Sequence, residues 1–449
     1  MTNQHSSAGK TATKTYRKIA IAACFGTFLE WYDFLTFATL AVVFGPLFFP
    51  SNDSNSGLLA SLATFGVGMV VRPIGAAFFG SLGDRIGRRP VFMITITLMG
   101  IATVGVGFLP IYTQIGLWAP ILLVGLRLLQ GFSAGGEIGG SAVYLTEHAG
   151  DQHRGLKTSF LQLMGPLGIL ASTLQITLLQ QGLSAEQFQS WGWRVPFWIS
   201  FGLLLLGLKA RLALEETPAF LALAKDANQS ANPLRDNLKD ADTRKRMFLL
   251  FFCVSSGGAI LFFCVQVYTS IFLKTSTTLP TQSIDVMSVY ATIALFPLTI
   301  VSGWLSDRIG RKPVVVSGLT LGALLILPAF KWMQAIANST NLAASNHHEN
   351  LSLMVILIGL SGILALVVGP QTALLAELFP AKTRNSAATL PHNLAAGWIG
   401  GLLPLTVTWL NQQWGDHTMG LWYPTLFLGT SAVVALIYLP ETVNRHLID

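Results

Sequence analysis

Charged residues are scarce in this sequence, since Asp, Glu, Lys and Arg together make up 11% of its 449 residues. A soluble globular domain typically carries about 25% charged residues, so the composition excludes an ordinary water-soluble fold. Cysteine is also rare, and Cys24, Cys253 and Cys264 all lie in apolar stretches, where we expect small buried side chains rather than a disulfide or metal set. The sequence has no P-loop and no Cys/His spacing typical of a metal site. These absences argue against an enzyme, ATP-driven chemistry, a bound metal and a cofactor.

Hydrophobic residues make up 52% of the chain, and they gather into long apolar stretches. A helix that crosses a bilayer needs about 20 mainly apolar residues. We therefore predict an all-α membrane protein with twelve transmembrane helices, in which Gly165–Gly168 and Gly369–Pro370 allow the fifth and tenth helices to bend. The predicted spans are residues 19–45, 57–80, 91–110, 117–144, 157–181, 194–213, 247–272, 286–305, 314–333, 351–376, 385–410 and 421–440.

Lysine and arginine are distributed unevenly between alternate loops. The tails, the central segment and every second loop hold 23 of them, whereas the opposite side holds only Lys274 and Lys331. Because cytoplasmic loops of membrane proteins carry the excess of positive charge, both termini are predicted to be cytoplasmic, in a multi-pass protein of the plasma (inner) membrane. The same distribution accounts for the net charge of +7 without a nucleic-acid partner.

Several charged motifs occur twice, in the same order. GSLGDRIGRRP at Gly80–Pro90 returns as GWLSDRIGRKP at Gly303–Pro313, and LEET at Leu214–Thr217 returns as LPET at Leu439–Thr442. Two homologous halves that face a central cavity are typical of alternating-access transporters. The chain is therefore divided into a cytoplasmic tail (1–18), a six-helix bundle (19–213), a cytoplasmic central segment (214–246), a second six-helix bundle (247–440) and a C-terminal tail (441–449).

The repeated DRxGR turns resemble the signature loop of the major facilitator superfamily. Further motifs resemble its metabolite:proton symporter family, namely FLEWYDF, RPIG, GLRLLQGFSAGGEIGG, WGWRVPF and AELFPAKTR. The resemblance covers the whole chain and implies two pseudo-symmetric six-helix bundles that work as a monomer. Members of this family carry citrate, 2-oxoglutarate, shikimate, or proline and betaine, so the resemblance does not select the substrate.

The repeated turns are interpreted as a cytoplasmic gate. A carboxylate at a helix end can pair with arginines across the turn and with the neighbouring bundle, and such pairs hold one gated state and break in the other. The alternative is that these charges only determine topology, since each exposed ion pair is worth about 1 kcal/mol or less. The gate residues, expected to stabilise the outward-open form, are Asp84, Arg85, Arg88, Arg89, Glu147, Arg154, Asp307, Arg308, Arg311, Lys312, Glu377 and Arg384.

Ionisable residues inside the spans are the strongest site candidates, because an unpaired charge there costs at least about 2.5–3.5 kcal/mol. Glu30 and Asp33 are one helical turn apart, and the repulsion between two carboxylates favours protonation of one of them. Asp33 is the first choice for the coupling proton and Glu30 the second. The alternative is that one of them neutralises a buried arginine such as Arg127. Glu137 lies among glycines and is expected to be a packing acid, with a second proton site as the alternative.

Three arginines in or beside the spans favour an anionic substrate. Arg127 offers a planar fork that fits a carboxylate, so it would bind substrate, or pair with a first-span acid when substrate is absent. Arg72 precedes Pro73, which can bend its helix, and is expected to face the cavity. Arg194 follows Trp193 and is expected to anchor the outer membrane interface, with attraction of anions as the alternative.

Uncharged polar residues are expected to complete the substrate site, mostly from the second half. We therefore predict proton-coupled uptake of a small carboxylate metabolite, such as a di- or tricarboxylate, a 2-oxo acid or a shikimate-like acid. The alternative is uptake of a zwitterionic osmolyte such as proline or betaine. The expected partners are this small molecule, protons and the lipid bilayer. The polar candidates are Tyr32, Gln266, Tyr268, Tyr290, Gln371, His392 and Asn393.

Overall fold

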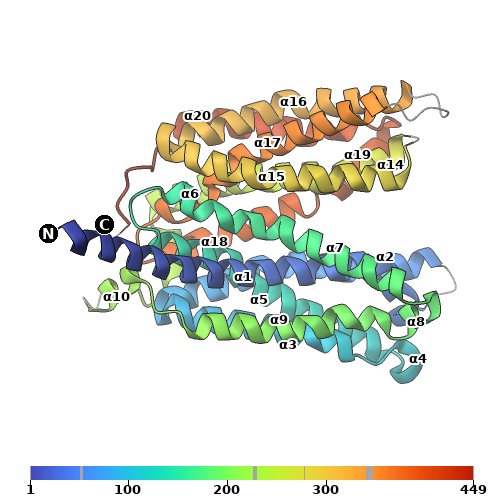
Figure 1. Ribbon diagram of the computed structural model, residues 1–449, viewed down its shortest axis with the longest axis horizontal. Coiled ribbons are helices and arrows are strands. Elements are labelled where there is room, and N and C mark those ends of the chain that lie inside the picture. The colour runs from blue at the N-terminus through green and yellow to red at the C-terminus, as the bar shows by residue number, and fades with distance from the viewer. Residues whose placement is uncertain (1, 51–53, 226–229, 278, 340–346, 448–449) are drawn as a thin grey trace.

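The computed structural model describes residues 2–50, 54–225, 230–277, 279–339 and 347–447. Residues 226–229 of the predicted central segment and 448–449 of the predicted C-terminal tail lie outside the described residues, as do the side chains of the basic residues Lys10 and Lys14. The described part is almost entirely helical (Figure 1).

Twelve helices in the described part are long and apolar enough to cross a membrane, which confirms the predicted fold class. Three of the spans are made of consecutive shorter helices. In the first half the spanning helices are α1 (Thr2–Phe48), α2 (Ser54–Ile86), α3 (Arg88–Phe108), α5 (Trp118–His148), α6 (Arg154–Ser159) with α7 (Met164–Gly182), and α9 (Val195–Leu212). In the second half they are α12 (Ala241–Leu249) to α14 (Thr269–Ser276), α15 (Thr281–Ile309), α16 (Arg311–Ser339), α17 (His347–Glu377), α18 (Arg384–Leu394) with α19 (Leu403–Trp414), and α20 (Trp422–Tyr438).

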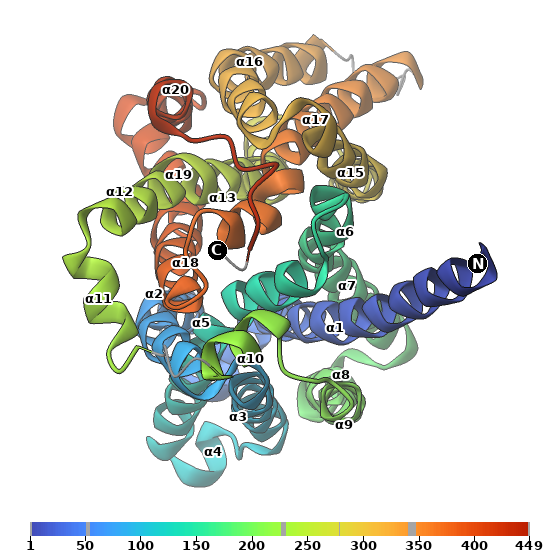
Figure 2. The same ribbon diagram turned by 90° about the vertical axis from the view of Figure 1, so that its left-hand side faces the viewer.

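The two halves lie side by side with their helices roughly parallel, and both chain ends lie at the same end of the molecule (Figures 1 and 2). We call this end the terminal face. Two helices reach across to the opposite half near it: α18 packs against α2 and α5, and α6 packs against α15 and α17. The short helices α10 (Pro218–Lys225) and α11 (Pro233–Lys239) of the central segment also lie at this face.

The glycine-rich motif of α5 allows this helix to pack directly against α2. A Cβ atom added to Gly131 would meet the backbone of Gly68, and one added to Gly135 would meet the carbonyl of Arg72. Small residues permit this close approach of transmembrane helices. The contact fixes the position of Arg72 beside the interior of the first half.

The helical irregularities agree only in part with the positions that the sequence predicted. Helices α7 and α17 remain continuous through Gly165–Gly168 and Gly369–Pro370, because these glycines serve close packing: Gly168 lies against α1 and Gly369 against α15. In the fifth span the helix changes type just before Gly165, at the 3₁₀ turn η1 (Phe160–Leu163). In the second half three segments are π-helical, η3 (Leu250–Ser255), η4 (Phe263–Tyr268) and η5 (Ala395–Gly400). Such segments occur frequently at functional sites.

Candidate functional site

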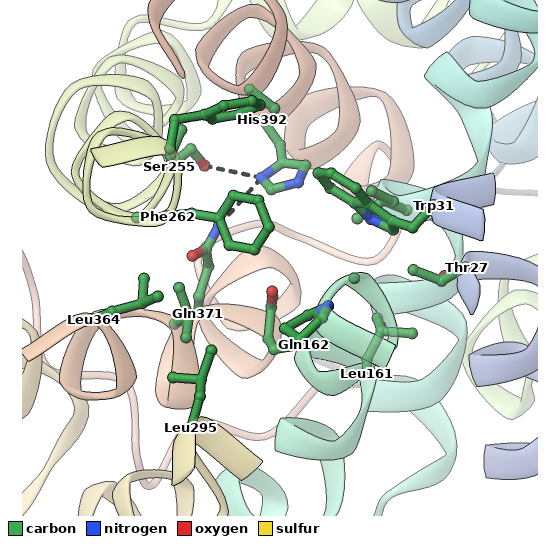
Figure 3. Close-up of a pocket in the computed structure, with 18 residues that line it drawn as sticks. Thr27, Trp31, Leu161, Gln162, Ser255, Phe262, Leu295, Leu364, Gln371 and His392 are labelled. Atoms are coloured by element: carbon green, nitrogen blue, oxygen red, sulfur yellow. Dashed lines mark hydrogen bonds between the residues drawn. The ribbon is translucent and has the colours of Figure 1, made fainter. Parts of the chain in front are cut away.

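A cavity lies between the two halves, and none of the residues that line it is charged (Figure 3). Each π-helical segment contributes to its wall, through Ser255, Phe263 and Ala396. No sequence signal marks these segments, because their residues are ordinary apolar and small helix residues. A local change of helical pitch therefore places three wall residues that periodicity alone would assign to other faces.

The cavity has a polar end and an aromatic end. Helix α1 runs away from the terminal face, so Thr27 lies nearer to that face than Trp31; the other lining helices give the same order. At the polar end, His392 Nδ1 lies 3.3 Å from both Ser255 Oγ and Gln371 Nε2. The polar end thus consists of Thr27, Gln162, Ser255, Gln371 and His392.

The aromatic end lies on the side away from the terminal face and joins the two halves. The ring of Trp31 from α1 lies 5.2 Å, between centroids, from the ring of Phe262 from α13 (Ser256–Phe262). A ligand in this cavity therefore meets hydrogen-bonding groups at one end and π-surfaces at the other. Aromatic faces attract both apolar groups and cations.

A buried ion pair lies beside the cavity. Glu30 of α1 pairs with Arg72 of α2, and each side chain is 2% exposed. Arg72 Nε also donates to Asn393 Oδ1 across 3.2 Å, and Asn393 of α18 directly follows the cavity residue His392. Glu30 Oε2 finds no hydrogen-bond partner among the described residues. The pair therefore connects the two halves at a point next to the cavity wall.

Asp33 and Arg127 lie within electrostatic reach of each other and are joined through Thr103 and Gln130 rather than by a direct ion pair. Asp33 Oδ1 accepts a hydrogen bond of 2.6 Å from Ser200 Oγ of α9. Arg127 bonds to Gln130 and lies over the ring of Phe37, 3.5 Å from its centroid. Neither residue lines the cavity, and among the described residues Arg127 forms no ion pair with Asp33 or Glu30. Of the two first-span acids, Glu30 forms a direct ion pair, and its partner is Arg72 rather than Arg127.

Two equivalent groups of buried charges join the halves at the terminal face. The first lock consists of Asp84, Arg88, Glu147 and Arg384. Glu147 Oε1 lies 2.9 Å from Arg384 Nη1 of the opposite half and 3.6 Å from Arg88, which also lies 3.3 Å from Asp84. All four side chains are buried, so these pairs are not the weak exposed pairs of the alternative interpretation.

The second lock consists of Asp307, Arg311, Glu377 and Arg154. Glu377 Oε1 lies 2.9 Å from Arg154 Nη1 of the opposite half and 3.2 Å from Arg311 Nη2, and Arg311 Nη1 lies 2.7 Å from Asp307. The arrangement repeats the first lock with the two halves exchanged.

Each signature aspartate also binds the start of a helix in the opposite half. Asp84 accepts hydrogen bonds from the backbone N–H groups of Asn385 (3.1 Å) and Ser386 (2.8 Å) in α18. Asp307 accepts bonds of 2.8 Å from the N–H groups of Gly155 and Leu156 in α6. A carboxylate at a helix N-terminus satisfies free N–H groups and interacts favourably with the helix dipole. These bonds cross the boundary between the halves, so separation of the halves at this face breaks them.

The sequence matches the family of sugar (and other) transporters over residues 19–449. The chain belongs to this family. The inner membrane metabolite transport protein YhjE of Escherichia coli (strain K12) is 36% identical, over 97% of this chain and 97% of the relative. The proline/betaine transporter of Salmonella typhimurium is 33% identical over 96% of this chain and 85% of the relative, and the shikimate transporter of Escherichia coli is 33% identical over 92% of both.

Solved structures of a major facilitator protein share the fold. The proton:xylose symporter XylE bound to 6-bromo-6-deoxy-D-glucose matches with a TM-score of 0.73 and 19% identity, over 97% of this chain and 98% of the other. With the twelve spans and the sequence relatives, this shows a major facilitator transporter, a multi-pass inner-membrane protein rather than an enzyme.

Several predicted substrate residues of this transporter lie outside the cavity lining. Of the predicted set, Gln371 and His392 line it, whereas Asn393 and Arg72 bond to each other outside the lining. Arg194 lies over the ring of Trp193 and donates to Leu109 O (2.8 Å), as expected of an interfacial anchor. The others turn elsewhere: Tyr32 bonds to Gln175, Gln266 to Thr292 and Tyr268 to Asn411, while Tyr290 is 53% exposed.

Four of the predicted gate residues take no part in the locks of this transporter. Arg85 and Arg89 are exposed, and Arg89 donates to Leu212 O rather than to Asp84. Arg308 is exposed and lies over the ring of Trp304, and the backbone N–H of Lys312 donates to Glu441. The reason is the turn between two helices: Gly87 and Gly310, each with a positive φ, end the helix of the aspartate, and the arginine that begins the next helix turns back to it.

The sequence reasoning missed the role of Glu216 and Glu441. Glu216 accepts hydrogen bonds of 3.1 Å from the N–H groups of Arg88 and Arg89, and Glu441 accepts bonds of 2.9 and 3.1 Å from those of Arg311 and Lys312. Each glutamate thus caps the helix that carries the lock arginine of its own half. Their presence in the repeated LEET and LPET motifs was the available signal.

The C-terminal tail crosses both locks. Arg384 Nη2 donates to Leu447 O (2.7 Å), and Arg154 Nη1 donates to Arg445 O (3.2 Å). Arg445 in turn donates to the carbonyl of Glu377 across 2.8 Å. One arginine from each half therefore holds the same short segment.

Proposed function

We propose that this transporter couples proton influx to the uptake of a small metabolite that carries a carboxylate, by alternating access. The observation that carries the proposal is the buried Glu30–Arg72 pair, which contacts Asn393 of the opposite half beside an uncharged cavity. The loop charges support a cytoplasmic terminal face. The locks then close the cytoplasmic side in the described conformation.

Proton and substrate are coupled through the charge of Arg72. When Glu30 takes up a proton, Arg72 loses its counter-charge, and a buried unpaired arginine is costly. A substrate carboxylate at the polar end compensates this charge, with Gln371 and His392 as hydrogen-bonding partners. Protonation without substrate and substrate without protonation both leave a charge uncompensated. The favourable states are therefore the empty, deprotonated carrier and the loaded, protonated one.

A zwitterion is the second candidate substrate, and the aromatic end of the cavity favours it. A quaternary or secondary ammonium group fits against Trp31 and Phe262, while the carboxylate occupies the polar end. No arginine side chain belongs to the cavity lining, which weakens the argument for a di- or tricarboxylate. Both a shikimate transporter and proline/betaine transporters are among the relatives.

Glu30→Gln is expected to abolish proton-driven accumulation and to preserve substrate exchange, because a neutral Gln mimics the protonated acid permanently. The test uses purified protein in liposomes, with labelled shikimate and labelled glycine betaine assayed separately, first in counterflow and then under an inward proton gradient. Asp33→Asn is the matched comparison. If only Asp33→Asn abolishes accumulation while preserving exchange, Asp33 carries the coupling proton. If wild-type uptake does not depend on the proton gradient, the proposed symport is wrong.

Trp31→Leu is expected to distinguish the two substrate classes. Loss of a cation–π contact worth about 0.5–2 kcal/mol weakens zwitterion binding by roughly 2- to 30-fold, whereas binding of an uncharged-ring acid such as shikimate changes less. The measurement is the rise in melting temperature with ligand, since a ligand that binds only the folded state stabilises it. An equal loss for betaine and shikimate would remove the aromatic end from substrate selection.

A further inference from the structure

A second buried ion pair lies in the first half, and the coupling described above does not use it. Glu137 of α5 pairs with Arg211 of α9, and each side chain is 1% exposed. Glu137 Oε2 also accepts from Thr95 Oγ1 (3.0 Å), and Arg211 Nη1 donates to Phe92 O (2.9 Å). Arg211 is one of the 23 basic residues assigned above to the predicted cytoplasmic side, and the structure buries its side chain inside the bundle.

The second pair lies one helical turn from Glu30, on the same side of α1. A Cβ atom added to Gly26 would collide with Arg211 Nη2 and with Glu137 Oε1, so both side chains press against the backbone at this glycine. Gly26 precedes Glu30 by four residues, and residues four apart lie on one face about 6 Å from each other. Glu30 also lies within electrostatic reach of Glu137 and Arg211. The two pairs are therefore stacked along α1.

The second pair is also close to the terminal face. Phe92, whose carbonyl binds Arg211, lies only four residues inside the start of α3, which is about 6 Å along the helix. The carbonyl of the neighbouring Leu212 already binds the exposed side chain of Arg89. Glu137 thus lies between the central acid Glu30 and the surface that carries the locks.

We propose that Glu137 is the second proton station of this transporter, through which the proton of Glu30 leaves toward the terminal face. This inference rests on the proposed symport. The proton passes from the Glu30 carboxyl to the Glu137 carboxylate at Gly26, either directly or through a water, and Glu30 returns to its ion pair with Arg72. Glu137 then releases the proton to water at the terminal face and re-forms its pair with Arg211.

The first lock controls this release. Arg211 precedes Glu216 by five residues, and Glu216 caps the start of α3 at Arg88, a member of the first lock. Opening of the lock displaces this segment and withdraws Arg211, so Glu137 can accept the proton. Closure of the lock brings Arg211 back to Glu137 and expels the proton. The groups that face Glu137 are Arg211 from α9, Thr95 from α3, Ser141 from its own helix, and Glu30 from α1.

The test compares Glu137→Gln with the double variant Glu137→Gln/Arg211→Gln. The double variant leaves no unpaired charge at this pair, so it can be assayed even if the single variant fails to fold. Both are assayed in liposomes with labelled glycine betaine and labelled shikimate. We expect counterflow within about twofold of wild type and proton-driven accumulation reduced at least about tenfold, the factor given by 1.4 kcal/mol. Infrared difference spectra between acid and alkaline pH are expected to lose one carboxylic C=O band in both variants.

Wild-type accumulation in the folded double variant overturns the proposal, as does an unchanged set of carboxylic bands. An equal loss of counterflow and accumulation in a variant that melts like wild type also overturns it, because this identifies a purely structural pair. Failure of the proposed symport itself is recognised separately, since wild-type uptake would then not respond to the proton gradient.

Discussion

Glu377→Gln is expected to destabilise the transporter by about 3–5 kcal/mol, the cost of removing one partner from a buried ion pair. The large effect is expected because Glu377 is fully buried and serves three partners. It pairs with Arg154 and Arg311, and it accepts a hydrogen bond of 2.6 Å from Thr442 Oγ1. Loss of its charge leaves two arginines short of a counter-charge at the boundary between the halves. The conformation closed at the terminal face should therefore lose population as well as stability.

Two measurements separate these effects. Denaturant unfolding of the purified protein reports stability, and thiol labelling of a cysteine introduced at Ser159, which packs against Gly303 of the opposite half, reports opening. The native cysteines are buried and give a low background. We expect labelling to accelerate at least about tenfold.

Asp151→Asn is the matched control for Glu377→Gln. Asp151 also pairs with Arg154, across 2.8 Å, but its side chain is 61% exposed. An exposed pair contributes about 0–1 kcal/mol, so stability and labelling should stay close to wild type. Equal effects of the two variants would mean that burial does not determine the strength of the lock, and the gate assignment would be lost.

Gly135→Val is expected to prevent α2 and α5 from packing, and to cost more than the 1–3 kcal/mol typical of overpacking within a core. A side chain at Gly135 meets the carbonyl of Arg72 and the backbone N–H of Ala76, and neither can move without displacing α2. Because Arg72 belongs to this stretch of α2, the variant should also lose exchange activity. The measurements are the yield of monodisperse protein, its melting temperature and counterflow.

Gly125→Val lies on the same helix and provides the control. Apart from its chain neighbours and the adjoining helix backbone, none of the described residues has an atom within 4 Å of a Cβ placed at Gly125. The same substitution there should change the melting temperature little, since valine is well tolerated in an apolar membrane environment. Comparable losses for both variants would contradict the role assigned to the close α2–α5 contact.

The twelve spans and the duplication could be predicted because both leave one-dimensional signals. Span length follows from bilayer thickness, and the repeated motifs are still recognisable by direct comparison of the two half-sequences. The cavity residues were harder to predict. Each residue of a helix turns the side chain by about 100°, so an error of one or two residues in rotation moves a side chain to another face. Arg127 was recognised as a buried charge but assigned to the cavity, whereas it faces Phe37.

The locks were predicted in composition but only partly in geometry. The repeat identified Asp84 and Asp307 as important residues. It did not indicate that each of them caps a helix of the opposite half. A cap across the boundary depends on how the halves meet, which no local pattern encodes. Glu216 and Glu441 were noted as repeated letters without a role, because the helix ends that they bind lie 125 or more residues away in the sequence. Proximity of this kind becomes visible only in the folded chain.

The tail segment at Arg445–Leu447 has a practical consequence. Arg154 and Arg384, one from each half, hold its carbonyl groups across the boundary. When the halves separate at this face, at least one of these bonds must break. The tail is therefore held less firmly while the terminal face is open than while it is closed. A fluorophore attached near this end would therefore change its environment with every turnover, and individual transport cycles could be followed in a single molecule without any labelled substrate.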